Sequence, residues 1–358
     1  MNDNKDKNYL SPKYSLIRRF FLNLFIITFL IMIYFYVSDY FGSISTIFLK
    51  NSKFFVSISF ILLIFVFFSI LAGPLPATIA GFFGELIYQF SFYENIRLDW
   101  CIIVSLIGLT VSIYKYKPLK YKSWRKLFYT FISLTISAFI ISFLIIIFQA
   151  ILNPIINLNS LLVDYGCKYL VHALLSVVLI IPLLVLIYDR ALANKEQHIY
   201  NLFLTHHPIY QSDHTFYLKF GRTYIYFCSR CSGVIIGGLI IIFINDVLNR
   251  AIGFTIEPEI AVILCIFLPI PGLIDWGTQR LLLRKSTTES RLLTGFIIGI
   301  ALYYLSFTDK YIIYMFFLII FYFSVVGIAL YIGQKRELKK AEEEEEYKSP
   351  KLEEDQFE

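Results

Sequence analysis

KLFYTFISLTISAFIISFLIIIFQA, residues 126–150, decides the fold class of this 358-residue chain. Only its first residue is charged, and the run exceeds the roughly 20 apolar residues that cross a bilayer as a helix. The whole sequence is 58% hydrophobic and 18% aromatic. This composition excludes an ordinary soluble domain and predicts an all-α polytopic membrane protein.

Similar apolar runs recur along the whole chain and predict about ten transmembrane helices. The third run is unusual because it contains Pro74, Pro76 and Glu85. This run is either a span or a re-entrant or kinked element, since broken helices are tolerated only where protein or water satisfies the backbone. The expected spans are 17–38, 54–72, 74–92, 99–115, 126–150, 166–189, 231–248, 259–275, 290–307 and 311–333.

The N-terminus and the segments that follow the fourth, sixth, eighth and tenth spans lie on the same side of the membrane. Basic residues are concentrated in these segments. They lie in residues 1–19, 115–126, 189–197, 280–285 and 334–340. Because cytoplasmic loops are enriched in Lys and Arg, we expect both termini in the cytoplasm and the protein in the cell membrane. These loop ends also explain the net charge of +6, so no nucleic-acid partner is expected.

A hydrophilic stretch at about 190–227 separates six spans from four. Within it, TFYLKFGRTYIYFC (215–228) alternates apolar and polar residues around a glycine, which predicts a small cytoplasmic β-hairpin. We therefore expect a six-span membrane domain at 1–190 and a four-span domain at 191–334. Residues 335–358 contain EEEEE and few apolar side chains, which predicts a disordered acidic tail.

Metal-binding residue types are concentrated in HHPIYQSDHTFYLKFGRTYIYFCSRC, residues 206–231. This stretch holds three of the five histidines and two of the five cysteines. The C-x-x-C spacing suits tetrahedral zinc, and a hairpin would fold the histidines back onto the cysteines. A reducing cytoplasm favours thiols or metal binding over a disulfide. The predicted ligands are His206, His207, His214, Cys228 and Cys231, with Asp275 available to complete the shell.

Two alternatives remain open for this cluster. A closed Cys₂His₂ shell is normally structural, whereas a catalytic zinc keeps one position open. The histidines could also be interfacial loop residues and the cysteines incidental.

A second polar patch covers residues 269–295. Asp275 and Gln279 are four residues apart and share one face of a helix. Ser286 and Glu289 have the spacing of a capping box that starts the next helix, and Arg291 follows in its first turn. A cation there is disfavoured unless an anion compensates it. Asp275, a phosphate or a lipid headgroup could be that anion, or the basic residues could be ordinary cytoplasmic anchors.

Small residues at four-residue spacing mark two of the predicted spans. Gly233 and Gly237 lie in the seventh, and Gly295 and Gly299 lie in the ninth. Such spacing lets helices approach closely. Packing of these two helices would bring the Cys231 and Arg291 ends together, so the two polar patches are expected to form one site.

Several motifs in one order, HHP with SDHTF, CSRCSGVIIGG, D-x-x-x-Q and STTESRLLTGFIIG, resemble the DUF2085 family of predicted membrane proteins. The resemblance covers residues 200–307 and implies a small multi-helix membrane domain. It implies no established activity. Its polar and small positions correspond here to His206, His207, Cys228, Cys231, Gly233, Asp275, Gln279 and Arg291.

The first six spans resemble the substrate-binding S-components of energy-coupling-factor vitamin transporters. The segment GPLPATIAGFFGELIYQF (73–90) carries this resemblance. It implies a small-molecule-binding module in which Glu85 lines a cavity. The chain departs from that pattern because its first span lacks a small-residue docking motif.

The leading functional hypothesis is a membrane protein with a cytoplasmic-face zinc-like site. One alternative is a small-solute transporter or substrate-binding component, with Glu85, Gln279 and Arg291 as candidate ligand-binding residues. Another is a thiol redox relay through Cys228 and Cys231. The chain has no P-loop, no G-x-S-x-G and no H-E-x-x-H motif, so the common soluble enzyme classes have no support.

Overall fold

The computed structural model describes residues 12–49, 58–93, 95–113, 124–190, 197–199, 215–220, 223–281, 283–284 and 287–354. The chain divides into two compact units. The N-terminal unit comprises Met1–Glu196 and Phe220–Thr223, and the C-terminal unit comprises Gln197–Lys219 and Tyr224–Glu358.

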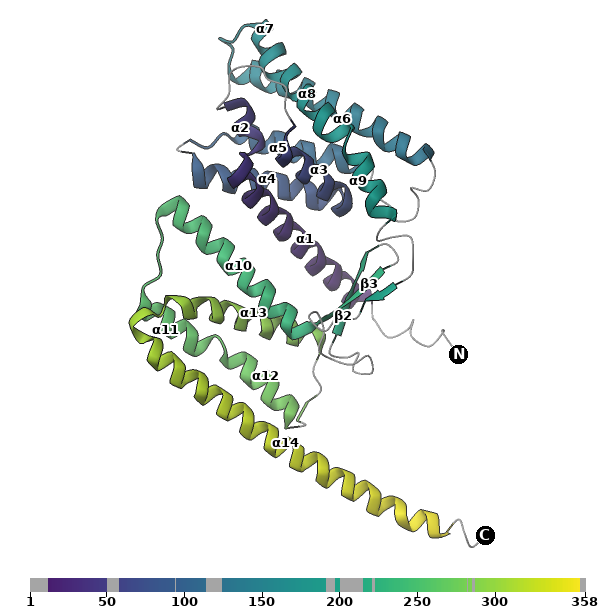
Figure 1. Ribbon diagram of the computed structural model, residues 1–358, viewed down its shortest axis with the longest axis vertical. Coiled ribbons are helices and arrows are strands. Elements are labelled where there is room, and N and C mark those ends of the chain that lie inside the picture. The colour runs from purple at the N-terminus through teal and green to yellow at the C-terminus, as the bar shows by residue number, and fades with distance from the viewer. Residues whose placement is uncertain are drawn as a thin grey trace. The chain divides into compact units, whose positions relative to one another are not determined.

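Helices make up most of the described part of the N-terminal unit (Figure 1). Two stretches, η1 (Leu161–Cys167) and η2 (Leu174–Val178), have π-helical geometry within a longer helical run. The α-helices are α1 (Pro12–Phe41), α2 (Ile44–Leu49), α3 (Phe60–Ala72), α4 (Pro74–Phe92), α5 (Leu98–Ser112), α6 (Trp124–Leu152), α7 (Leu158–Ser160), α8 (Lys168–Ala173) and α9 (Ile181–Tyr188).

The C-terminal unit combines a small sheet with five helices. Its three strands lie in the order β1-β3-β2, so β2 and β3 are neighbours joined by two residues. Short 3₁₀ turns at Leu305–Phe307 and Asp309–Tyr311 join α13 to α14. The elements are β1 (Gln197–Ile199), β2 (Thr215–Phe220), β3 (Thr223–Cys228), α10 (Ser229–Ile252), α11 (Pro258–Phe267), α12 (Ile270–Arg280), α13 (Thr288–Tyr304) and α14 (Ile312–Glu354).

Helices occupy all ten predicted spans, but fewer are long and apolar enough to cross a bilayer. Among the described residues, seven helical segments meet that condition. At about 1.5 Å per residue, α3 and α5 are only about 20 and 22 Å long, shorter than a hydrocarbon core of about 30 Å. The seven are Asn23–Phe48, Leu127–Leu152, Leu158–Tyr188, Ser229–Ile252, Pro258–Arg280, Thr288–Phe307 and Asp309–Arg336.

The third predicted span is one continuous helix, α4. Both prolines of this span, Pro74 and Pro76, lie in its first turn, where the missing N–H has no intrahelical partner to lose. Gly73 has a φ of 96°, a conformation that glycine adopts without strain. The chain therefore changes direction at Gly73, between α3 and α4, and α4 continues through the buried Glu85.

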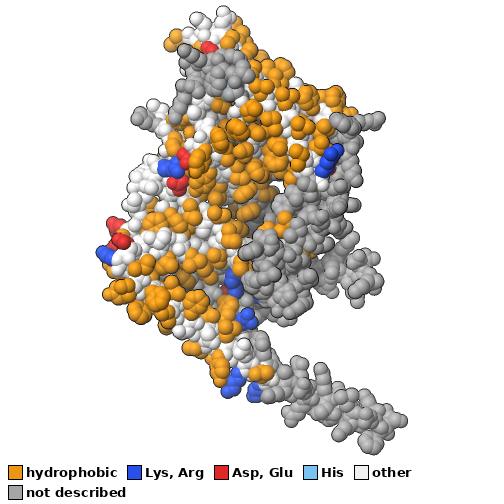
Figure 2. All heavy atoms as spheres, viewed as in Figure 1, with side chains coloured by type: hydrophobic (Ala, Val, Ile, Leu, Met, Phe, Trp, Pro, Cys, Tyr) orange, Lys and Arg blue, Asp and Glu red, His pale blue; other side chains and the backbone are white. Residues whose placement is uncertain are grey.

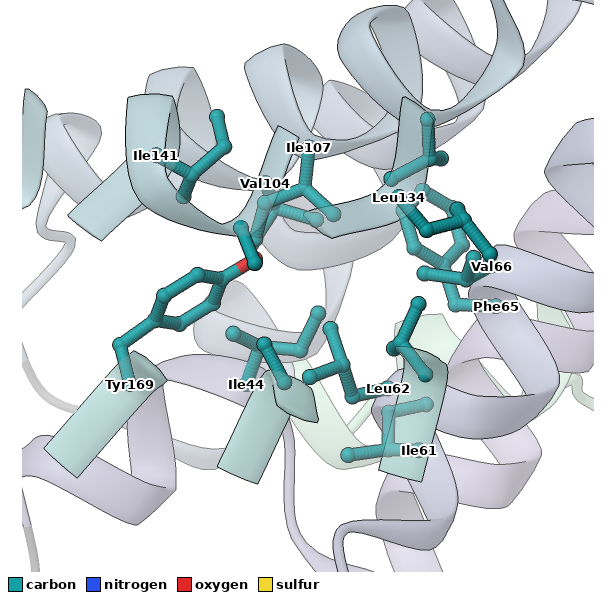
Figure 3. Packing of buried hydrophobic residues seen from close by; sticks show 14 of the residues in the cluster. Ile44, Ile61, Leu62, Phe65, Val66, Val104, Ile107, Leu134, Ile141 and Tyr169 are labelled. Atoms are coloured by element: carbon teal, nitrogen blue, oxygen red, sulfur yellow. The ribbon is translucent and has the colours of Figure 1, made fainter. Parts of the chain in front are cut away.

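Apolar side chains from several helices form the core of the N-terminal unit. Figure 3 shows Ile44 from α2, Leu62 and Phe65 from α3, and Val104 and Ile107 from α5 meeting in this cluster. All five are almost completely buried. This packing holds the short helices α2, α3 and α5 against one another.

Large apolar side chains also cover much of the surface, as Figure 2 shows in orange. On α6, for example, Phe143 is 63% exposed and Ile151 is 72% exposed. Contiguous apolar surface of this kind is unfavourable in water and is what lipid tails cover in a bilayer.

In the C-terminal unit, α10 and α13 lie side by side (Figure 1) and their backbones touch through glycines. A Cβ built on Gly237 would lie 2.1 Å from the carbonyl oxygen of Phe296, and one on Gly299 would lie 2.1 Å from that of Val234. Gly233 and Gly295 are equally crowded, each 2.3 Å from a carbonyl oxygen of the facing helix. All four predicted packing glycines thus lie in one helix contact.

The acidic tail differs from its prediction, because α14 continues to Glu354. The segment that contains EEEEE is helical in the structure rather than disordered. Glu, Lys and Ala are strong helix formers, and a helix already formed by residues 312–334 can propagate into them without a new nucleation step.

Substituting Gly299 by Ala should destabilise the C-terminal unit, because the new methyl group cannot fit against the Val234 carbonyl. Overpacking of this kind costs about 1–3 kcal/mol. Thermal unfolding in detergent measures the effect. Gly238→Ala is the matched control: its Cβ would lie 3.8 Å from its nearest neighbour, the Gly299 carbonyl oxygen, so it should be neutral or mildly stabilising. Equal melting temperatures for the two variants would contradict the contact.

Candidate functional site at the start of α10

The two cysteines of the C-x-x-C motif lie where strand β3 passes directly into helix α10. Cys228 is both the last residue of β3 and the N-cap of α10, and Cys231 lies in the first helical turn. Cys228 is buried, Cys231 is exposed, and neither forms a disulfide. The two thiols interact with each other, so the motif forms a pair of sulfur atoms at the helix start.

The register of β2 and β3 follows from the two-residue connection between Phe220 and Thr223, and two aromatic pairs across the strands agree with it. The Phe216 and Phe227 rings are 5.7 Å apart, and the Tyr217 and Tyr226 rings are 5.8 Å apart. In an antiparallel pair this register puts Thr215, the first residue of β2, opposite Cys228, the last residue of β3. The chain therefore enters β2 beside the cysteine pair.

Asp275 on α12 is the centre of the polar network in this unit. It is only 3% exposed, and its carboxylate accepts hydrogen bonds from four side chains. Arg230 on α10 and Gln279 on α12 donate to Oδ2 at 3.0 and 2.7 Å. Arg284, from the loop after α12, and Ser290 on α13 donate to Oδ1. One carboxylate thus joins α10, α12 and α13.

These donors use the hydrogen-bonding capacity of Asp275. A carboxylate offers about four acceptor positions, and two guanidinium groups, an amide and a hydroxyl fill them here. The two Arg–Asp ion pairs leave one positive charge in excess over the carboxylate. Asp275 therefore acts as an ionic anchor in this structure, and it has no free position from which to complete a metal shell.

The glycine contact places Arg230 for this role. The Cβ position of Gly295 lies 2.3 Å from the Arg230 carbonyl oxygen, so the α10 backbone touches α13 at that residue. Arg230 and Ser290 were not among the sequence-predicted site residues. Sequence spacing could have identified Arg230, because it lies three residues before Gly233 and hence on the glycine face of α10.

The remaining predicted residues are only partly brought together. Gln279 accepts a 3.4 Å hydrogen bond from Arg230 in addition to its contact with Asp275. Arg291 is buried in the first turn of α13. The cap of α13 is Thr287, whose hydroxyl accepts the Ser290 N–H at 3.2 Å. The Ser286–Glu289 capping box lies one residue away, and Ser286 is outside the described residues.

Three of the predicted metal ligands, His206, His207 and His214, lie outside the described residues. Within the described ranges, no group of three His, Cys, Asp or Glu side chains is placed to hold a metal ion. Glu85, the third predicted ligand-binding residue, belongs to the N-terminal unit, where it is fully buried.

One stretch of the chain contains most of this arrangement: the β2–β3 pair, the C-x-x-C motif at the start of α10 and the glycine contact between α10 and α13. Residues 210–305 match the model of the DUF2085 family, described as a predicted membrane protein. The match confirms the resemblance expected for the C-terminal half. Together with the apolar helices, it makes this chain an integral membrane protein. No curated protein and no solved structure matches the chain.

Replacing Asp275 by Asn should destabilise the C-terminal unit strongly. The change leaves Arg230 and Arg284 without their counter-charge, and breaking a buried pair from one side costs about 3–5 kcal/mol. Resistance to unfolding in a denaturing detergent titration measures the effect. Asp246→Asn is the matched control, because Asp246 pairs with Arg250 one turn away on a partly exposed surface; such pairs contribute about 0.3–0.5 kcal/mol. A similar loss in both variants would contradict the central position of Asp275.

Proposed function

We propose that this protein is a metal-binding integral membrane protein whose Cys/His site fastens the β-hairpin to the start of α10. The metal is zinc or a zinc-like ion, held by Cys228, Cys231 and histidines of the 206–214 segment. The observation that carries the proposal is the pair of neighbouring, unoxidised thiols at the point where β3 becomes α10. Two thiolates on one turn are the usual half of a tetrahedral zinc shell.

The strand register supports a contribution from the histidine side. Thr215 lies opposite Cys228, and paired residues of antiparallel strands have Cα atoms about 4.5–5.5 Å apart. His214 directly precedes Thr215, and consecutive Cα atoms are about 3.8 Å apart. Among the three histidines, His214 is therefore the one that chain connectivity ties most closely to the cysteine pair.

The state of Asp275 favours a structural role over a catalytic one. Its carboxylate is fully engaged by protein donors, so it supplies neither a ligand nor a free base. A closed shell of two cysteines and two histidines is the typical structural zinc site. The basic loops predict that this face of the protein is cytoplasmic, where thiols stay reduced and available to metal.

Elemental analysis of the purified full chain in detergent tests the proposal. About one zinc per chain is expected for a closed site, and the double change Cys228→Ser with Cys231→Ser should abolish it. His214→Ala should lower the zinc content as well. Cys167→Ser removes an exposed thiol of the N-terminal unit and should leave the metal content unchanged. Metal that is far below one per chain and unaffected by these changes would contradict the site.

The same thiol pair favours one second candidate, a redox relay between Cys228 and Cys231. The thiols are neighbours and Cys231 is exposed, so an oxidant in solution can reach this pair. Maleimide labelling separates the two candidates. A metal site predicts thiols that react only after a chelator is added, whereas a relay predicts thiols that react at once and become protected after mild oxidation.

A further inference from the structure

The N-terminal unit contains a buried carboxylate that the metal site does not use. Glu85 on α4 is 0% exposed. Its Oε1 accepts hydrogen bonds from Gln89 Nε2 at 2.8 Å and from Ser43 Oγ at 3.2 Å. The Tyr34 hydroxyl donates to Oε2. Residues from α1, from the α1–α2 turn and from α4 itself therefore surround one acidic group.

The orientation of these donors is fixed by their own partners. Gln89 Oε1 accepts the Arg97 backbone N–H at 2.7 Å, so its amide nitrogen must face Glu85. The Tyr34 hydroxyl oxygen accepts the Ile44 N–H at 3.3 Å, so its proton is directed to Glu85. The site is therefore built to present donors to the carboxylate.

In the described part of the chain, no partner of Glu85 is positively charged. The titratable groups around it are Tyr34 on α1, Tyr88 on α4 and Cys101 on α5, all of which are neutral near pH 7. Lys168 on α8, a buried cation, donates to the Ile47 carbonyl at 2.7 Å. A buried carboxylate without a counter-charge is expensive, whereas its hydroxyl and amide donors stabilise the ionised form. The two effects oppose each other, and binding of a proton removes the cost of the uncompensated charge.

A chain of hydroxyl groups leads from Glu85 to the end of α4. Ser43 Oγ lies 3.2 Å from Glu85 Oε1 and 3.1 Å from Thr46 Oγ1. Thr46 Oγ1 lies 2.6 Å from the hydroxyl of Tyr93, a partly exposed residue at the C-cap of α4. Each hydroxyl both donates and accepts a hydrogen bond, which is the property that stepwise proton transfer requires.

We propose that Glu85 is a proton-binding group of this membrane protein and that Ser43, Thr46 and Tyr93 form the relay that loads it. A proton from water enters at Tyr93, and each hydroxyl accepts a proton on its oxygen as it passes its own proton inward. The net change is one proton lost by the solvent and one neutral carboxylic acid formed at Glu85. That proton supplies the positive charge which the protein does not place beside the carboxylate.

Infrared difference spectroscopy on the full chain in lipid vesicles tests the proton site. A pH step should change the carbonyl band of a buried carboxylic acid in the wild-type protein, and Glu85→Gln should remove that change. Circular dichroism establishes that the variant is folded. Glu85→Asp keeps a titratable group and should restore a shifted band. A pH-dependent band that persists in Glu85→Gln, or the absence of any such band in the wild-type protein, would overturn the proposal.

The relay has its own test in the rate at which the band appears. Thr46→Val keeps the side-chain shape but removes the hydroxyl, and it should slow protonation by about tenfold or more. Thr78→Val makes the same change in a hydroxyl that bonds only to its own helix, at Pro74, and should leave the rate unchanged. Equal rates in the two variants would refute the relay.

Discussion

The close backbone contact between α10 and α13 is the constraint on which the C-terminal unit depends. Lipid tails are as apolar as leucine side chains, so hydrophobic burial cannot hold two membrane helices together, and van der Waals packing must do so. Four glycines allow carbonyl oxygens of one helix to occupy the space where side chains of the other would lie. The same contact brings Arg230 of α10 close to the first turns of α13, where it hydrogen-bonds Asp275. Without it, the ionic network would have no fixed geometry.

Patterns that repeat along the sequence predicted their structures well. Hydropathy predicted a helix at every expected span, and the four-residue glycine spacing marked the helices that touch. Alternation around Gly221 marked the two strands that pair in the sheet. These features depend on local periodicity, which a single sequence contains.

Features that depend on how helices meet were less accessible. Nothing local to Asp275 indicates that Arg230, forty-five residues earlier in the chain, occupies its acceptor position; this contact follows only after α10 and α12 are placed. The cap of α13 was one residue away from its expected position because Ser286 and Thr287 both have capping side chains. The acidic tail was taken as disordered from its composition, although the same residues are strong helix formers.

Two of the buried carboxylates in the described part of the chain, Asp275 and Glu85, are balanced in opposite ways. Asp275 is compensated by two guanidinium groups and ties three helices together. Glu85 has only neutral donors, although it is at least as deeply buried. A carboxylate with permanent counter-charges stabilises one structure. A carboxylate without them, such as Glu85, responds to the proton concentration.

The junction at Cys228 has a mechanical consequence. Because one residue ends β3 and caps α10, no linker separates the sheet from the membrane helix. Any displacement of the sheet along the strand direction must shift or rotate α10, and the glycine contact allows α13 little room to stay behind. A movement of the sheet is therefore transmitted directly to α10 and, through the glycine contact, to α13.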